Sequence, residues 1–175
     1  MSVILLSKDD CSYVKSFWDD SISKGGSKYG SFELQSGNNI RFRTKVQGNY
    51  IDFHQGHSLF NFILKKVQVL GIKSISSGIK LARYGKGDYF EPHHDFNFYG
   101  EGALYKTLVI QLSDNLDYKG GDLLVKQVPQ MREVGSYSLF LSSDIHEVTL
   151  ITEGERWSMS IFLLEKDFVN VKHTI

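Results

Sequence analysis

The 175-residue sequence has a single cysteine, no net charge and no long hydrophobic run. One thiol, Cys11, excludes an internal disulfide and indicates a reducing compartment, so we expect a cytoplasmic protein. Twenty basic and twenty acidic residues cancel, which argues against a general attraction to nucleic acid or membranes. No stretch approaches the roughly 20 apolar residues that a membrane span needs, and the first apolar run, at 3–6, is too short for a signal peptide.

The length and composition indicate one globular domain with a sizeable core, since 41% hydrophobic and 23% charged residues are ordinary values. We expect this single domain to cover residues 1–175, with a helical and hairpin part at 1–72 and a β core at 73–165. Apolar residues at helical spacing predict two helices, over 8–22 and 56–70. The sequence Ser-Gly-Asn-Asn between them predicts the turn of a hairpin with strands at 31–35 and 40–47.

Beyond residue 73 the pattern changes to short β-prone segments separated by turn residues. We predict strands at 75–84, 89–96, 104–112, 122–128, 137–142, 146–151 and 155–164. Turns that contain glycine are expected at 85–87, 97–102, 117–121 and 152–154. Many short strands with such breaks are typical of a sandwich or jelly roll. We therefore expect a mainly β fold in which the two flanking α-helices cover one outer face.

The most informative residues are two histidines and an aspartate at 93–95, followed about fifty residues later by another histidine. If this segment is a strand, His93 and Asp95 point to one face and His94 points to the other. An imidazole and a carboxylate on one face are two thirds of the facial triad that holds non-haem Fe(II) and leaves three coordination positions open. His146 is the natural third ligand. A lone histidine is more often a surface or core residue, so the interpretation depends on all three together.

The predicted last strand places Arg156, Ser158 and Ser160 on one face and apolar residues on the other. Such a strand would line a polar cavity while its apolar face packs under the helices. A buried arginine needs an anion, and its planar guanidinium suits a carboxylate, so a bound dicarboxylate would serve. The alternative is a surface salt bridge from Arg156 to Glu155 or Glu147.

Residues 84–96, Tyr-Gly-Lys-Gly-Asp-Tyr-Phe-Glu-Pro-His-His-Asp-Phe, closely resemble the iron-binding strand of prolyl 4-hydroxylases. Later blocks resemble those of bacterial and viral relatives, in the same order and spacing, at 112–114, 118–123, 146–149 and 154–158. The resemblance covers about residues 75–165, and the combination of motifs is far more specific than any one of them. It implies a 2-oxoglutarate- and Fe(II)-dependent dioxygenase of the prolyl 4-hydroxylase-like family, with a double-stranded β-helix (jelly-roll) core.

Position by position, the resemblance implies that His93, Asp95 and His146 are the iron ligands and that Arg156 binds the distal carboxylate of 2-oxoglutarate. Tyr84 matches a tyrosine that hydrogen-bonds this co-substrate in some relatives, and a core aromatic is an equal interpretation. The implied cofactors are Fe(II) and 2-oxoglutarate, with ascorbate as a further candidate. Related halogenases lack a carboxylate at the position of Asp95, so its presence argues for hydroxylation by O2 with release of succinate and CO2.

The substrate stays open, and the resemblance favours a peptidyl prolyl residue. The same chemistry on a free amino acid or a nucleic-acid base is an alternative, and so is a non-catalytic jelly-roll binding module. Arg41, Arg43 and Lys45 alternate on a predicted strand with aromatic residues nearby, a pattern that could hold phosphates and bases. A solvated hairpin face, or a lid over a peptide, explains the same residues. We expect a peptide or small-molecule partner, with nucleic acid as the open alternative, and no membrane.

Overall fold

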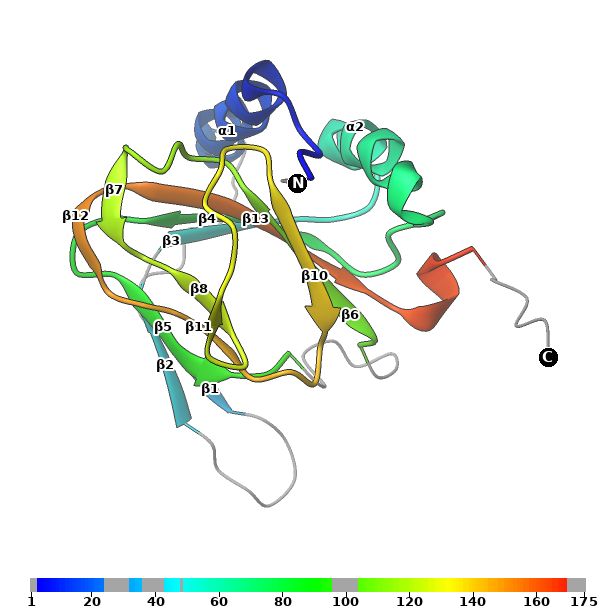
Figure 1. The fold of residues 1–175 in the computed structure, drawn as a ribbon. Helices are drawn as coiled ribbons and strands as arrows, with labels where there is room; N and C mark the ends of the chain where they lie inside the picture. The colour runs from blue at the N-terminus through cyan, green and yellow to red at the C-terminus, as the bar shows by residue number, and fades with distance from the viewer. Residues whose placement is uncertain (1–2, 24–31, 36–42, 48, 96–103, 170–175) are drawn as a thin grey trace.

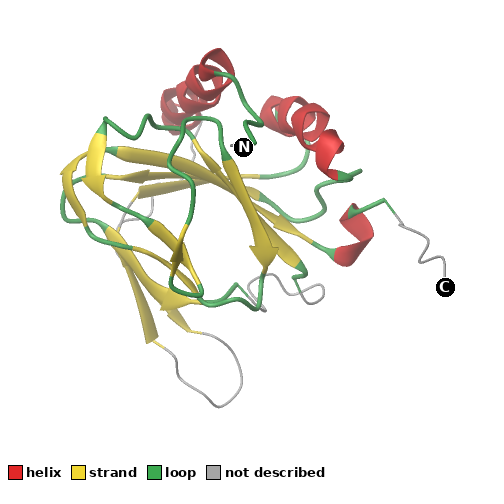
Figure 2. Ribbon diagram, viewed as in Figure 1, coloured by secondary structure: helices red, strands yellow, loops and turns green. Residues whose placement is uncertain are grey.

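The computed structural model describes residues 3–23, 32–35, 43–47, 49–95 and 104–169, and the side chains of 3–18, 50–95 and 104–169. Two sheets face each other, and two helices lie over the outer side of one of them (Figures 1 and 2). Every pairing between described strands is antiparallel. This arrangement confirms the mainly β, jelly-roll fold that the sequence predicted.

The five-stranded sheet lies under the helices. In spatial order its strands are β10 (Tyr137–Leu141), β6 (Lys106–Gln111), β13 (Arg156–Leu163), β4 (Ile79–Tyr84) and β3 (Asn49–Phe53). The facing six-stranded sheet consists of β1 (Phe32–Gln35), β2 (Arg43–Gln47), β5 (Tyr89–His93), β11 (His146–Val148), β8 (Leu123–Val125) and β9 (Val128–Pro129). A separate ribbon pairs β12 (Ile151–Gly154) with β7 (Tyr118–Gly120).

The two predicted helices are present as α1 (Lys8–Ser23) and α2 (Ser58–Val67). At the start of α1, the Asp10 N–H donates to Ser7 Oγ and the Ser7 N–H donates to Asp10 Oδ2, a reciprocal cap. The last turn of the predicted second helix is a 3-10 turn (Gln68–Leu70), and Gly71 ends it with a φ of 75°. A second 3-10 turn (Glu165–Asp167) follows β13. No helix in the described part of the chain is long and apolar enough to cross a membrane.

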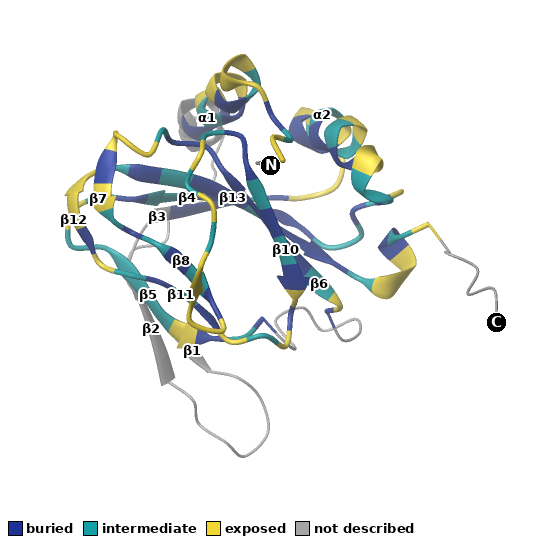
Figure 3. Ribbon diagram, viewed as in Figure 1, coloured by how far each residue is buried: buried dark blue, intermediate teal, exposed yellow. Residues whose placement is uncertain are grey.

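The five-stranded sheet has a hydrophobic core on each of its faces. Much of β6 and β13, in the middle of this sheet, is buried (Figure 3). The larger core lies between this sheet and the helices, and β13 contributes Met159, Ile161 and Leu163 to it. The smaller core lies between the two sheets, with Tyr84 from β4 and Val148 from β11. The alternation predicted for the last strand is therefore confirmed, and its other face is turned toward the space between the sheets.

Several predicted boundaries were wrong, for local reasons. Strand β3 was not predicted, and segments 117–121 and 152–154, predicted as turns, supply the paired strands β7 and β12. The predicted strand 122–128 is a tight hairpin of β8 and β9, because Lys126 and Gln127 both adopt positive φ, at 51° and 65°. Positive φ at both central residues defines a type I′ turn, which Asn-Gly ordinarily signals and this sequence lacks.

The predicted N-terminal hairpin is confirmed by the antiparallel pairing of β1 with β2, and β2 pairs in turn with β5. Strands that precede residue 73 therefore join both sheets of the β core. The predicted turn at 36–39 lies outside the described residues. The basic side chains Arg41, Arg43 and Lys45, and the aromatic ones near them, also lie outside the side chains that the structure describes.

Candidate metal centre

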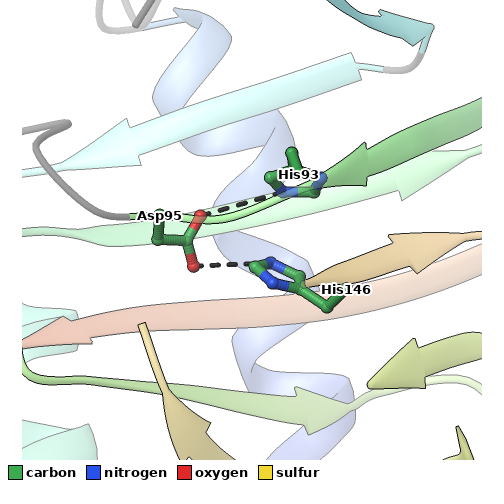
Figure 4. Close-up of side chains that lie close together, drawn as sticks. All are labelled: His93, Asp95 and His146. Carbon is green, nitrogen blue, oxygen red and sulfur yellow. Dashed lines mark ion pairs between the residues drawn. The ribbon is translucent and has the colours of Figure 1, made fainter. Parts of the chain in front are cut away.

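Strands β5 and β11 hold the two histidines of the predicted triad directly opposite each other, His93 at the end of β5 and His146 at the start of β11. Asp95 follows β5, where its backbone N–H donates to the Ser142 carbonyl at 2.9 Å. The three side chains are buried, and one ligand atom from each lies within 4.8 Å of the others (Figure 4). The structure thus brings together residues that are some fifty positions apart in the sequence.

Both imidazoles are oriented by backbone carbonyls. The Nδ1 atom of His93 lies 2.7 Å from the Glu91 oxygen, and that of His146 lies 2.9 Å from the Asp144 oxygen. A carbonyl only accepts, so Nδ1 carries a proton, and in the neutral ring the lone pair is then on Nε2. The two Nε2 atoms face Asp95, at 3.8 Å from Oδ1 for His93 and 3.4 Å from Oδ2 for His146. This tautomer is the one that coordinates a metal through Nε2.

Burial lowers the pKa of His93 well below its ordinary value, and the neighbouring His146 lowers it further. The ring is therefore neutral at neutral pH and available as a ligand. Two imidazoles and one carboxylate are the donor set that suits Fe(II) with open coordination positions. The residues present therefore fit an iron ion. Half-buried His94 is not among the described residues that line the cavity beside this cluster.

The carboxylate of Asp95 is fixed by a threonine that the sequence analysis did not identify. Thr107, buried on β6, donates its hydroxyl to Asp95 Oδ2 at 2.6 Å and lies 3.1 Å from Ser142 Oγ. Hydrogen bonds of this kind aim a ligating carboxylate at its metal. No signal in the sequence marks Thr107, because its role depends on how β6 packs against the end of β5.

Replacing Thr107 by valine should weaken metal binding while His93, Asp95 and His146 stay unchanged. Valine keeps the shape and removes the hydrogen bond, and loss of such a bond typically lowers metal affinity about 10- to 100-fold. Anaerobic titration with Fe(II) measures the affinity, with exposed Thr152→Val as the matched control. Wild-type affinity in Thr107→Val would show that the bond has no part in holding Asp95.

Arg156 lies in the same cavity as the cluster, on β13, and is 2% exposed. Its Nη1 donates to Ser158 Oγ at 3.2 Å, and it forms no ion pair with a described carboxylate. Glu155 pairs instead with Arg83 at 2.6 Å, and Glu147 accepts from a glutamine. The alternative of a surface salt bridge from Arg156 is therefore wrong. A buried cation without a protein anion is suited to bind an anionic ligand.

Tyr84 lies beside this arginine, paired across β4 and β13, with the guanidinium carbon 5.7 Å from its ring centroid. The Tyr50 hydroxyl donates to the Tyr84 hydroxyl at 2.7 Å, and no described residue accepts the proton of Tyr84 itself. Burial raises the pKa of Tyr84 to about 12, so that proton is retained at neutral pH. Tyr84 and Arg156 together form a buried pair of donors facing the cavity.

Tyr50 was missed by the sequence analysis, because strand β3 was missed. Residues 49–53 alternate in the period of a half-buried strand, with Ile51 and Phe53 under the helices and Tyr50 in the core between the sheets. That alternation was the available signal. The alternating segment is only five residues long and lies between the predicted hairpin and the predicted second helix, so it was not recognised as a separate strand.

The family model described as the 2OG-Fe(II) oxygenase superfamily matches residues 79–164. A PKHD-type hydroxylase of Parvibaculum lavamentivorans is 33% identical over 82 residues, which are 45% of this chain and 37% of that protein. The chain thus spans well under half the length of this curated relative. The cofactors in the superfamily's description, Fe(II) and 2-oxoglutarate, are the two that the sequence predicted, and ascorbate stays a prediction.

Solved structures of prolyl hydroxylases share the fold. The viral collagen prolyl hydroxylase of Paramecium bursaria Chlorella virus-1, in its 2OG complex, has a TM-score of 0.62 at 16% identity, with 93% of each chain covered. A prolyl hydroxylase from Trichoplax adhaerens, in complex with a hypoxia inducible factor peptide fragment, has a TM-score of 0.59 at 18% identity, covering 95% of this chain and 82% of that one. At these identities the likeness shows the fold.

Proposed function

We propose that this chain, which the model of the 2OG-Fe(II) oxygenase superfamily matches over residues 79–164, is a 2-oxoglutarate- and Fe(II)-dependent dioxygenase that hydroxylates a C–H bond. One observation carries the proposal: the His-Asp-His cluster and the buried arginine, which no described carboxylate pairs, line the same cavity. The His-Asp-His cluster fits a metal ion, and the arginine fits a carboxylate. A non-catalytic binding module has no use for both in one cavity.

In this proposal His93, Asp95 and His146 hold Fe(II), and Arg156 and Tyr84 bind the distal carboxylate of 2-oxoglutarate. The guanidinium supplies a charge-assisted pair, and Tyr84 adds a neutral donor whose direction Tyr50 fixes. The side chains of Tyr84 and Arg156 are already held in place without the ligand, so binding costs little of their conformational entropy.

When bound, the metal and the co-substrate supply the oxidising chemistry: 2-oxoglutarate, O2 and a C–H bond become succinate, CO2 and an alcohol. The residues of the chain orient the reactants and exclude water. Carbonyls at Glu91 and Asp144 keep the imidazole lone pairs directed at the metal position, and Thr107 does the same for Asp95. Apolar side chains from both sheets, Val109, Leu123 and Phe162 among them, line other parts of the cavity and limit its hydration.

A peptidyl prolyl residue is the proposed substrate, supported by the structural likeness to a prolyl hydroxylase that was solved with a peptide. A free amino acid is the alternative within the same chemistry, and a nucleic-acid base is less favoured because the chain has no net charge. The proposed compartment is the cytoplasm, in keeping with the single, buried free thiol of Cys11.

Succinate release tests the proposal directly. Protein loaded with Fe(II) and 2-oxoglutarate should release succinate slowly alone and faster with a proline-containing peptide or amino acid, and mass spectrometry should find one added oxygen in the product. The same assay with oligonucleotides tests a nucleic-acid substrate. If only oligonucleotides stimulate succinate release, the substrate is a nucleic acid. If no succinate is released under any condition, the proposed dioxygenase activity is contradicted.

Replacing Tyr50 by phenylalanine should weaken 2-oxoglutarate binding about 3- to 10-fold without changing iron affinity. The variant removes the donor that orients Tyr84, a neutral hydrogen bond worth about 1 kcal/mol. Binding of 2-oxoglutarate to the anaerobic Fe(II) protein gives the affinity. Tyr137→Phe, on a half-buried tyrosine outside the cavity, is the control. Equal losses in both variants would indicate a general effect on packing.

A further inference from the structure

A second cation lines the cavity with Arg156, and the proposed chemistry leaves it without a role. Lys80 lies on β4 opposite Ser160 of β13, and its side chain is 23% exposed. Its Nζ lies 3.9 Å from Asp52 Oδ1, too far for a hydrogen bond. No described residue accepts a hydrogen bond from Nζ, although an ammonium group has three protons to donate.

Lys80 stands at the metal end of the cavity. Its Nζ is 5.8 Å from the centroid of the Phe162 ring, and Phe162 lies opposite Thr107, the residue that holds Asp95. It is also 5.4 Å from the Tyr50 ring centroid. The ammonium is thus beside two aromatic rings in the cavity that the His-Asp-His cluster also lines.

Lys80 and Arg156 come from separate positions along the five-stranded sheet. Arg156 and Ser160, the partner of Lys80, are four residues apart on β13, which is about 13 Å between their Cα positions. Asp52 lies directly opposite Lys80 on β3, with Oδ1 3.9 Å from Nζ. The carbon chain of 2-oxoglutarate has four bonds of about 1.5 Å, roughly half the Cα span at most. We therefore expect a 2-oxoglutarate on Arg156 to leave Lys80 available to a second anion.

The charges around the cavity leave the ammonium of Lys80 open to a closer anion. The described residues that line it include two cations, Lys80 and Arg156, and one carboxylate, Asp95. Asp52 lies outside this lining and offsets the charge of Lys80 from 3.9 Å, without a hydrogen bond. A substrate carboxylate that accepts a hydrogen bond from Nζ would compete with Asp52, in a cavity where apolar walls strengthen the attraction.

We propose that Lys80 binds a carboxylate of the substrate that is oxidised, and so selects acidic substrates. This assignment rests on the proposed function, because it takes Arg156 as the 2-oxoglutarate site. The carboxylate has two sources: the α-carboxylate of an amino acid or C-terminal residue, or an acidic side chain beside the target residue in a peptide. A charge-assisted pair discriminates such a substrate from its amide by about tenfold or more.

Two matched pairs of probes separate the sources. N-acetyl-L-proline and N-acetyl-L-prolinamide test the α-carboxylate, and end-blocked proline peptides with Glu or Gln beside the proline test the side chain. Binding is measured by calorimetry on protein loaded with Zn(II), which is redox-inert, and saturating 2-oxoglutarate, so that Arg156 is occupied and nothing turns over. In at least one pair the acid should bind about tenfold more tightly than its amide.

That preference should disappear in Lys80→Met and persist in Lys80→Arg, with Kd for the amides unchanged in both. Lys119→Met, at an exposed ion pair outside the cavity, should keep the preference, and Asp52→Asn should increase it by removing a competing carboxylate. Equal or absent binding of acid and amide in both pairs, or a preference that survives in Lys80→Met, would overturn the role of Lys80. Failure of the wild-type protein to bind 2-oxoglutarate would instead overturn the proposed function.

Discussion

Asp95→Ala protein is expected to release succinate more than about a hundredfold more slowly than wild type, and His93→Ala and His146→Ala should do the same. Loss of residues that merely support a metal ligand costs about 10- to 100-fold, so loss of a ligand should cost more. Each variant also removes one of the three donors that the described part of the chain brings together. Anaerobic Fe(II) titration and succinate release, measured on the same preparations, give the two effects together.

His94→Ala is the matched control, since it removes a neighbouring imidazole that is not part of the cluster. It should keep most of the iron affinity and turnover. Full activity in His146→Ala, or loss of iron in His94→Ala with the fold retained, would contradict the proposed ligand set. Circular dichroism and thermal melting of each variant distinguish loss of metal from loss of fold.

Arg156→Met should weaken 2-oxoglutarate binding by about 2–4 kcal/mol, roughly 30- to 1000-fold, with iron still bound. The guanidinium is 2% exposed and has no anionic partner among the described residues, so the ligand provides the compensating charge. Methionine has a similar length and no charge. The same variant should melt at or above the wild-type temperature without ligand, because an uncompensated buried charge is removed.

Thermal melting with and without 2-oxoglutarate measures both effects. The ligand should raise the melting temperature of wild type and leave that of Arg156→Met almost unchanged. Arg156→Lys should recover part of the shift, since lysine keeps the charge and loses the bidentate geometry. An unchanged shift in Arg156→Met would place the carboxylate site elsewhere.

The sequence was most informative where side chains alternate over a long strand. Arg156, Ser158 and Ser160 were predicted to face a cavity, and the eight residues of β13 carry that alternation without a break. His93 and Asp95 were predicted on one face, and the structure places them in one cluster although β5 ends between them. The hydrogen bond from the Asp95 N–H to Ser142 continues the extended geometry beyond the strand.

Residues whose roles depend on contacts between distant segments could not be predicted. Thr107 holds Asp95 from β6, Tyr50 orients Tyr84 from β3, and Lys80 is set apart only by its place in the cavity. The ribbon of β7 and β12 was mistaken for turns because it contains glycines. Only glycine fits at position 154, because the two strands approach so closely that a Cβ atom there would lie 2.0 Å from the Asp117 carbonyl oxygen.

Anaerobic addition of 2-oxoglutarate to the Fe(II) protein, followed by visible absorption, tests the central claim most directly. A metal-to-ligand charge-transfer band should appear and saturate at one equivalent in wild type. It should be absent in Asp95→Ala and require far more 2-oxoglutarate in Arg156→Met. A wild-type protein that binds neither Fe(II) nor 2-oxoglutarate, or a band of equal strength and affinity in all three proteins, would contradict the account.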